Sequence, residues 1–322
     1  MTSSRRPQPS LMETEQVLGL TVLVVSTDEA LGAEWQGSAR SADLVQVRRP
    51  DPARWPELRA AGFIPRPDRV SWVASAPSDD EEFLGLLSVK GRQDVRRAMR
   101  RAASSQVEVA VRDTIDVRFY DEFLTLYQQQ IDAMRYGLPI AVWERDRVLQ
   151  SSERFFAVAA SRHGRLVGAC IGERRPEHGA AWIRFCAVDE SRRRQSLARV
   201  LYLRASVAVG GEGYKVVVLG NDLGLYGQIA EVGLLGFKTR LGFVPRPSHE
   251  MTPGEGFDVA DRIVSLRNLA DPSVVLAYQR SVSEDLVSVV VGSDPRGLRD
   301  RIKLATGSQI ARSVVVTRAA QD

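Results

Sequence analysis

The chain has 322 residues, of which 44% are hydrophobic, and a formal net charge of +4 at pH 7. This length exceeds that of one ordinary domain, so we expect two domains and a small additional unit. No stretch approaches the roughly 20 consecutive apolar residues of a membrane-spanning helix. The two cysteines, Cys170 and Cys186, exclude a disulfide framework and indicate a reducing compartment, and we therefore expect a cytoplasmic protein.

The first half of the chain alternates between strand-like and helix-like segments. Residues 1–14 are expected to form a disordered tail. Hydrophobic periodicity predicts strands at 21–25, 68–75 and 107–112, and helices at 30–40, 51–63, 90–105 and 117–136. The helix at 90–105 is strongly basic, and its Arg92, Arg96 and Arg100 share one face because they are spaced four residues apart.

From residue 153 the predicted elements become regular. The order is β-β-β-α-β-α-β and ends near residue 245. Its last part, the stretch GLLGFKTRLGFVPRP at 233–247, looks like an apolar hairpin into which Lys238 is inserted directly after Phe237. Residues 254–322 are expected to form a separate small α/β unit, with a helix at 258–270, a strand at 285–293, a helix at 294–305 and a strand at 311–318.

The order of elements at 153–245 resembles the GNAT N-acyltransferase fold. In that family a strand leads into an arginine- and glycine-rich turn, and the backbone amides of the following helix N-terminus hold the pyrophosphate of an acyl carrier. The corresponding corner here is VDESRRRQSLA at 188–198, in which Arg193, Ser196 and Ala198 occupy the motif positions. Ser196 replaces the first glycine of the motif. The acyl carrier could therefore be one other than coenzyme A.

A more specific resemblance comes from FKTRLGF at 237–243, where Lys238 stands at the position of a tyrosine found in many GNAT enzymes. A phenylalanine–lysine pair before a GF turn is similar to that of the Fem-type (FemABX-like) aminoacyltransferases. Those proteins are tandem GNAT lobes that move an amino acid from aminoacyl-tRNA onto a peptide amine. Residues 80–113 also resemble a phrase of that family.

The resemblance implies an α/β fold (α+β) with two GNAT-like mixed-sheet lobes. The N-terminal lobe, degenerate in its motifs, would span 15–112, and the C-terminal lobe with the active site would span 113–250. Residues 254–322 would be a small α/β appendage. The sequence leaves the role of this appendage and the oligomeric state open.

The same resemblance suggests residues for the reaction. Lys238 would stabilise negative charge at the reacting carbonyl or a nearby phosphate, and the backbone of Phe237 would help position the acceptor amine. Asp222, at the end of a predicted strand, would orient or deprotonate that amine, although it could equally cap the next turn. A surface lysine that covers apolar neighbours remains the alternative for Lys238.

Two basic segments suggest binding of phosphates. Three arginines at a predicted helix start oppose the helix dipole, which suggests that an external anion offsets them. The donor-binding set expected there, with the neighbouring strand end, is Arg192, Arg193, Arg194, Ser196 and Asn221. The basic helix would offer a polyanion groove through Lys90, Arg92, Arg96 and Arg100, or would simply be a solvated face.

The sequence thus favours an N-acyltransferase that moves an acyl or aminoacyl group to an amine of a peptide or small molecule, with aminoacyl-tRNA as the favoured donor. Acyl-CoA or an acyl carrier protein is the second possible donor. A non-catalytic binding protein on a degenerate GNAT scaffold is the third reading, because the motif glycine and tyrosine are missing. We expect no metal and no permanently bound cofactor, since the acyl donor would be a co-substrate.

Overall fold

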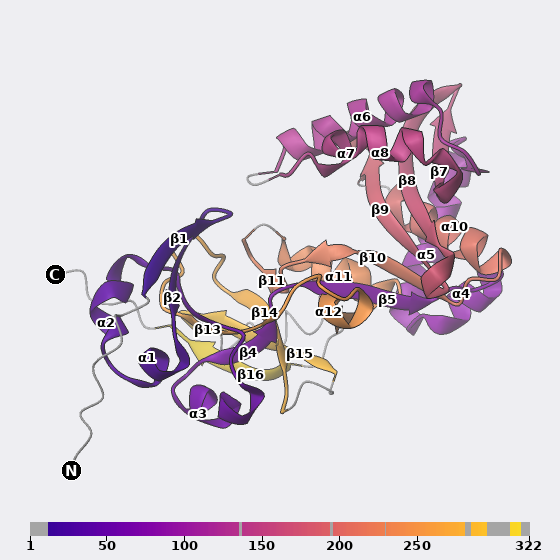
Figure 1. The fold of residues 1–322 in the computed structure, drawn as a ribbon. Coiled ribbons are helices and arrows are strands. Elements are labelled where there is room, and N and C mark those ends of the chain that lie inside the picture. Colours follow the sequence, from indigo (N-terminus) through magenta and orange to yellow (C-terminus); the bar gives the residue numbers. More distant parts are fainter. Residues whose placement is uncertain are drawn as a thin grey trace, which may run out of the picture.

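The computed structural model describes residues 12–134, 137–193, 196–228, 230–280, 285–294 and 310–316. Residues 1–11 of the expected tail and most of the helix expected at 294–305 lie outside the described residues. In the described part, the chain is a mixed α/β structure with three sheets (Figure 1), which agrees with the predicted fold class. Each sheet contains one parallel pair among antiparallel strands.

A seven-stranded sheet carries the candidate site. In sheet order its strands are β12 (Val244–Pro247), β5 (Val70–Ser75), β10 (Val216–Asp222), β9 (Ala180–Val188), β8 (Arg165–Arg175), β7 (Phe155–Arg162) and β6 (Glu108–Arg112). The order β-β-β-α-β-α-β predicted from residue 153 onward is confirmed, with the short strand β11 (Leu225–Tyr226) added between β10 and the last helix.

Helices cover both faces of this sheet. One face packs against α4 (Asp80–Leu86), α5 (Val89–Ser104), α10 (Leu197–Gly211) and α11 (Val232–Arg240). The other face packs against α6 (Val117–Asp132), α7 (Ile140–Trp143) and α8 (Arg145–Gln150), as Figure 1 shows. Helix α5 buries Val95, Ala98 and Ala102, which are spaced as one face of a helix requires.

A five-stranded sheet holds the N-terminal segment. Its strands, in order, are β1 (Glu13–Val17), β2 (Leu20–Val25), β3 (Leu44–Arg48), β13 (Asp258–Ile263) and β4 (Ile64–Pro67). The helices α1 (Thr27–Leu31), α2 (Trp35–Ser38) and α3 (Trp55–Ala60) belong to the same part of the chain. Trp35 and Trp55 are buried in its core.

The third sheet has four strands, in the order β11-β14-β15-β16, with β14 at Ser273–Tyr278, β15 at Leu286–Gly292 and β16 at Ile310–Val315. Two short helices, α9 (Glu190–Arg193) and α12 (Ser248–Met251), complete the described elements together with single 3₁₀ turns at Ala39–Ser41, Pro52–Arg54, Ser152–Arg154 and Pro176–His178. The strands expected near 285–293 and 311–318 correspond to β15 and β16.

The sheets do not follow the expected lobe boundaries at 112 and 254. Strands β5 and β6 come from the expected N-terminal lobe but belong to the seven-stranded sheet. Strand β13 comes from the expected appendage but pairs with both β3 and β4. Its segment was also expected to be a helix, and that prediction is wrong. Hydrogen bonding to two neighbouring strands outweighs a local helical pattern, which carries little weight in a sheet interior.

The stretch 233–247 also differs from the expected hairpin. It forms α11, which ends at Arg240, and then β12. Gly242 has a φ of 83°, a left-handed conformation that allows the chain to leave the helix and enter the strand. Lys238 therefore projects from a helix, and its neighbour Phe237 points in a different direction because successive residues of a helix are about 100° apart.

The strands β9 and β10 diverge in the middle of the seven-stranded sheet. Their parallel pairing runs from Val216 opposite Ala180 to Leu219 opposite Ile183. Just beyond, the register of β8 and β9 shifts, and Arg184 is the extra residue of this β-bulge. The chain thus opens a gap between two adjacent strands where α10 begins, and the candidate site lies around this gap.

Candidate active site

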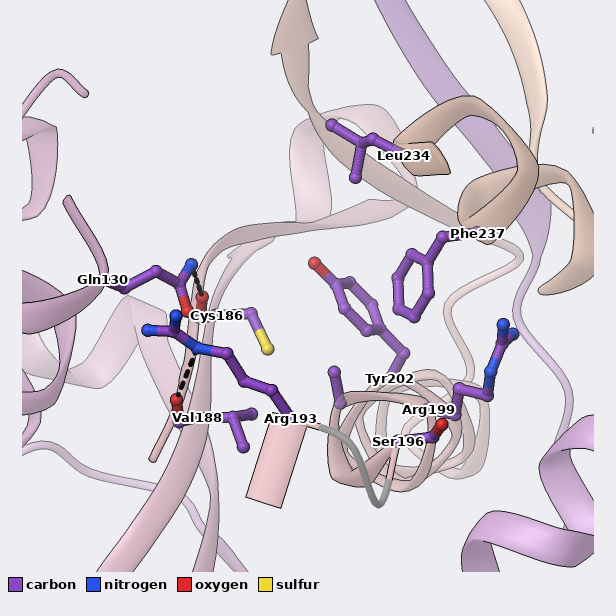
Figure 2. Close-up of a pocket in the computed structure, with 10 residues that line it drawn as sticks. Gln130, Cys186, Val188, Arg193, Ser196, Arg199, Tyr202, Leu234 and Phe237 are labelled. Carbon is purple, nitrogen blue, oxygen red and sulfur yellow. Dashed lines mark hydrogen bonds between the residues drawn. The ribbon is translucent and has the colours of Figure 1, made fainter. Parts of the chain in front are cut away.

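A cavity of about 290 Å³ lies between β9, α10 and α11. Its polar lining residues are Gln130, Cys186, Arg193, Ser196, Arg199 and Tyr202. Its apolar lining residues are Val188, Ala198, Leu234 and Phe237. Figure 2 shows these side chains arranged around the first turns of α10, with the Tyr202 hydroxyl and the Cys186 sulfur both directed into the cavity.

The N-terminus of α10 opens onto this cavity. Its N-cap residue, Ser196, has a φ of 62° and makes no side-chain capping hydrogen bond. The first amide groups of a helix have no partners within the helix, and the helix dipole adds partial positive charge there. An uncapped N-terminus beside a cavity is therefore suited to an anion.

Arg199, in the first turn of α10, strengthens this positive end. It is only 8% exposed, and its guanidinium lies 4.9 Å from the centre of the Phe237 ring. Its Nη1 has no hydrogen-bond partner among the described residues. Burial lowers the pKa of Arg199, and the charge of Asp94 opposes this effect. Asp94 itself lies 3.8 Å from Arg240. This buried guanidinium adds positive charge beside the N-terminus of α10, and no described group uses its Nη1 donor.

The predicted arginine cluster is split by the structure. Arg193 lines the cavity, and its Nε donates a hydrogen bond of 3.3 Å to the carbonyl oxygen of Val188. Arg192 lies with it on the short helix α9 but is not among the lining residues. Arg194 lies outside the described residues. Of the donor-binding residues expected from the sequence, Arg193 and Ser196 therefore border the cavity.

Tyr202 supplies the phenol of the cavity. Its ring packs edge-on against Phe237, with 5.5 Å between the ring centres. Burial raises the pKa of Tyr202 well above its ordinary value, and the neighbouring Cys186 adds to the effect. The hydroxyl therefore keeps its proton at neutral pH.

Lys238 and Asp222 are brought together by the structure, but they lie outside the cavity lining. The Lys238 Nζ is 2.8 Å from the Asp222 Oδ2, and the two side chains are 10% and 12% exposed. The ammonium also lies 5.2 Å from the centre of the Trp72 ring. The buried ion pair shows why the sequence places a cation in an apolar stretch: its counter-ion is a carboxylate of the same chain.

The Asp222 carboxylate is fully engaged. Its Oδ2 also accepts hydrogen bonds from the Trp72 indole at 2.8 Å and the Tyr226 hydroxyl at 2.7 Å, and its Oδ1 accepts one from the Gly224 amide at 2.9 Å. Burial alone would raise the pKa of Asp222, but the Lys238 charge and these hydrogen bonds hold it below its ordinary value. The predicted base for the amine is thus a buried carboxylate whose two oxygens both already accept hydrogen bonds from the same chain.

The remaining predicted residues lie on other surfaces. Asn221 is hydrogen-bonded to Glu255 and does not line the cavity. Of the basic set on α5, Arg92 is half-buried, whereas Lys90, Arg96 and Arg100 are exposed. Helix α5 packs directly against α10, so these exposed charges lie on a helix that neighbours α10 and does not line the cavity.

Two features are absent from the residues that the structure describes. These residues contain no cluster of three or more histidine, cysteine or carboxylate side chains that could hold a metal ion. No described helix is long and apolar enough to cross a membrane.

Comparison with known proteins identifies the domain around the cavity. The profile of the acetyltransferase (GNAT) family matches residues 117–227. Residues 117–227, about a third of the chain, are therefore similar to a GNAT domain. The match begins with α6 and includes β7 to β10 and α10, so it covers the strand gap and the uncapped helix N-terminus. The matched family is one of acetyltransferases, which agrees with the family resemblance of the sequence.

Solved structures with a similar arrangement have low identity to this chain. A protein named FemX is 11% identical with a TM-score of 0.43, and the match covers 79% of this chain and 83% of that one. L-PGS from Bacillus licheniformis is 13% identical with a TM-score of 0.39, covering 80% and 82%. No curated protein matches the chain. The function proposed for this chain therefore depends on its own residues around the cavity and not on these structures.

Sequence reasoning missed Arg199 and Tyr202. Both lie on α10, three and six residues after Ser196, and neither belongs to a phrase that stood out in the sequence. The available signal was their position near the start of the helix, where Arg199 is a cation among apolar residues. Their convergence on the cavity depends on Phe237, which is far away in the chain.

Proposed function

We propose that the protein transfers a small acyl group from a phosphate-bearing carrier to an amine. The observation that carries this proposal is the buried guanidinium of Arg199, which has an unused donor beside the uncapped N-terminus of α10. Together they offer a phosphate two kinds of hydrogen-bond donor in a partly dry site, where such bonds are strong. Arg193 would contribute a second positive charge at the cavity rim.

The size of the cavity limits the acyl group. A volume of about 290 Å³ is at the lower end of the range of ligand pockets. It suits an aminoacyl or short acyl unit together with the adjoining part of its carrier. We therefore expect poor activity with long-chain acyl donors.

Aminoacyl-tRNA is the favoured carrier because of α5. Lys90, Arg96 and Arg100 are exposed on this helix, and its Asp94 lies close enough to Arg199 to influence its pKa. A nucleic acid backbone bound along α5 would therefore lead toward the cavity. Acyl-CoA is the second candidate, favoured by the anion site at the start of α10, which alone could hold a pyrophosphate.

The transfer would be a direct displacement. The amine nitrogen attacks the carbonyl carbon, a C–N bond forms, and the bond from carbon to the carrier oxygen or sulfur breaks. The leaving atom takes the electron pair of that bond and needs a proton, and the attacking nitrogen must lose one to become an amide. Tyr202 borders the cavity and is the group proposed to protonate the leaving atom, and its phenolate regains through water the proton that the nitrogen gives up.

A donor titration tests the proposed function. Charged tRNA, uncharged tRNA, acetyl-CoA and an acyl carrier protein bearing an acyl group are each added while the melting temperature is followed. A donor present at 100 times its Kd should stabilise the native protein by about 2.7 kcal/mol. We expect charged tRNA to give the largest shift. Failure of every donor to shift the melting temperature would contradict the proposal and support a non-catalytic role.

Replacement of Tyr202 with phenylalanine should slow the transfer and leave donor binding intact. Because the phenylalanine ring keeps the contact with Phe237, we expect the Kd of the donor to stay within about 2-fold of its original value. We expect kcat to fall roughly 10-fold, because the leaving group loses its proton donor. The control is Tyr214→Phe, which lies outside the cavity lining. An unchanged kcat in Tyr202→Phe would exclude Tyr202 as the proton donor.

A further inference from the structure

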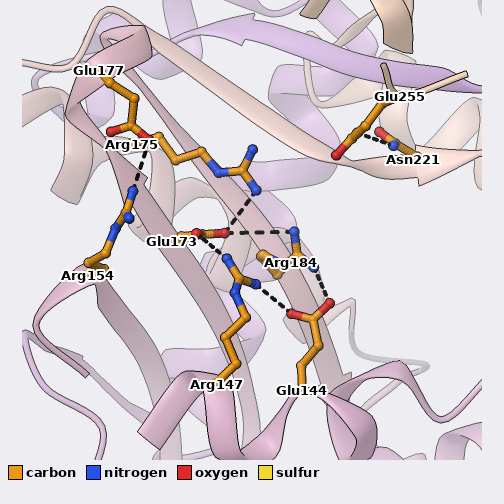
Figure 3. Close-up of polar contacts among 9 residues, drawn as sticks. All are labelled: Glu144, Arg147, Arg154, Glu173, Arg175, Glu177, Arg184, Asn221 and Glu255. Carbon is orange, nitrogen blue, oxygen red and sulfur yellow. Dashed lines mark hydrogen bonds and ion pairs between the residues drawn. The ribbon is translucent and has the colours of Figure 1, made fainter. Parts of the chain in front are cut away.

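The carboxylates on the face of the sheet that packs against α6, α7 and α8 are mostly neutralised by arginines. Glu173 is 3% exposed in its side chain and pairs with Arg147, Arg175 and Arg184. Glu144 and Glu177 also pair with arginines, as Figure 3 shows. These three carboxylates already have their counter-ions, so none of them needs a cation from a substrate.

Glu255 differs from them. It is half-buried, and its Oε2 accepts a hydrogen bond of 2.7 Å from the Nδ2 of Asn221, a neutral amide (Figure 3). Among the described residues, no lysine, arginine or histidine forms an ion pair with it. The described part of the chain therefore leaves the charge of this half-buried carboxylate available for a ligand.

The loop that carries Glu255 is held in place. The Glu255 amide donates to the carbonyl oxygen of Thr252 at 3.0 Å, which closes a turn. The next residue, Gly256, has a φ of 92°, and a Cβ there would lie 2.5 Å from the Asp68 Oδ1. The same oxygen accepts a hydrogen bond from the Phe257 amide at 2.7 Å. Only glycine fits this position, and the carboxylate is presented at a defined place.

The partner of Glu255 is equally constrained. The Ser71 hydroxyl donates to the Asn221 Oδ1 at 2.7 Å, and the Ser248 hydroxyl lies 3.0 Å from Ser71. With its oxygen occupied in this way, Asn221 must turn its NH₂ group toward Glu255. One carboxylate oxygen of Glu255 is thereby fixed, and Oε1 has no hydrogen bond recorded within the described ranges.

The position of this carboxylate relates it to the reaction. Ser71 lies between Val70 and Trp72, which face α10 and α11, so Ser71 and its partner Asn221 face the opposite side. Gly220 lies beyond the last paired residue of β10, and a Cβ on it would be 3.8 Å from the Arg184 carbonyl oxygen. Two residues after Arg184, Cys186 lines the donor cavity. Asn221 and Glu255 therefore lie on the β10 side of the strand gap, on the face of the sheet opposite α10 and α11.

We propose that Glu255 binds the ammonium group of the acceptor and takes its proton before the attack. This inference rests on the proposed function and names the chemical class of the acceptor, a primary amine that arrives protonated. The ammonium gives one proton to the Glu255 carboxylate, and the freed nitrogen lone pair attacks the acyl carbon across the gap. The bond to the carrier breaks, the leaving group takes its electron pair and one proton, and Glu255 later releases its proton to water.

The variant Glu255→Gln tests the proposal with little structural change. The glutamine carbonyl still accepts the hydrogen bond from Asn221, whereas the charge and the base are lost. Transfer is measured to glycinamide, a protonated amine, and to hydroxylamine, which is already uncharged at pH 7, from whichever carrier raises the melting temperature of the original protein. The matched control is Glu177→Gln, which removes a carboxylate on the same side that pairs with Arg154.

For Glu255→Gln we expect the rate of transfer to glycinamide at pH 7 to fall roughly 30-fold. The fall is smaller than a complete loss of base catalysis would give, because water can take the proton in place of Glu255. The rate should recover as the pH rises and the free amine becomes abundant. Transfer to hydroxylamine and the Kd of the donor should stay within about 2-fold, since neither needs the base. Equal losses with both nucleophiles, or no loss with glycinamide, would overturn the role of Glu255. Absence of any transfer by the unaltered protein would instead overturn the proposed function, and the inference with it.

Discussion

Replacement of Arg199 with glutamine is expected to weaken donor binding by at least about 30-fold. Removing one partner of a buried, hydrogen-bonded charge pair costs about 2–5 kcal/mol, and each 1.4 kcal/mol corresponds to a factor of about ten. Arg199 is a buried lining residue of the cavity at the positive end of α10, so a carrier phosphate bound there would lose a nearby positive charge. The Kd for the carrier, measured by titration, checks this expectation.

The stability of the same variant separates a binding role from a structural one. A buried charge without an ion pair is costly, so its removal should leave the urea midpoint of the free protein unchanged or raise it. The control is Arg204→Gln on the same helix, where the arginine pairs with Asp80 at 2.7 Å and is 39% exposed. If the control weakens donor binding as strongly as Arg199→Gln, the effect is one of net charge, and the proposed phosphate site is wrong.

Replacement of Lys238 with methionine is expected to lower the free energy of unfolding by about 3–5 kcal/mol, because it leaves the buried Asp222 carboxylate without its counter-ion. The remaining hydrogen bonds to Asp222, from Trp72, Tyr226 and Gly224, offset only part of that cost. Urea unfolding at pH 7 measures the loss. The exposed Lys215→Met should change the free energy of unfolding by less than about 0.5 kcal/mol.

The pH dependence of this pair has a definite sign. The pKa of Asp222 is lowered in the native protein, so the native state binds fewer protons than the unfolded state in the acidic range. The ion pair therefore contributes fully to the free energy of unfolding when the pH is above the unfolded-state Asp pKa of about 3.9. This contribution is lost as the pH falls through the pKa that Asp222 has in the native protein. In Lys238→Met, burial raises the pKa of Asp222 because the lysine charge no longer opposes it. The difference in free energy of unfolding between the variant and the original protein should therefore become smaller as the pH falls. A difference that stays constant between pH 7 and pH 3.5 would contradict the ion-pair account.

The same variant bears on the catalytic role that the sequence suggested for Lys238. With its ammonium 2.8 Å from Asp222 and outside the cavity lining, we propose that Lys238 anchors the strand β10 to α11 and that Arg199 provides the charge toward the donor. Lys238→Met should accordingly retain donor binding at temperatures where it is folded. A folded variant that binds the donor but transfers nothing would restore the original assignment.

Local sequence pattern was enough to predict much of the seven-stranded sheet and its helices. The alternating and continuous apolar runs of β7 to β9, the helical spacing of α5 and α6, and the corner before α10 each depend on residues close in sequence. The same local pattern gave a wrong prediction for β13, which was expected to be helical. Its six residues lie between β3 and β4, and hydrogen bonds to strands some 200 residues earlier in the chain decide its conformation.

The sequence by itself determined that this chain contains a GNAT-like succession of strands and helices with a basic helix beside it, because periodicity and turn residues act over a few positions. Only the tertiary structure decided which charges meet. It paired Lys238 with Asp222, left Arg199 buried with an unused donor, and set Glu255 beside Asn221 on the β10 side of the strand gap. Whether a charged side chain binds a ligand or another side chain depends on distance and burial, and these follow from how remote segments pack.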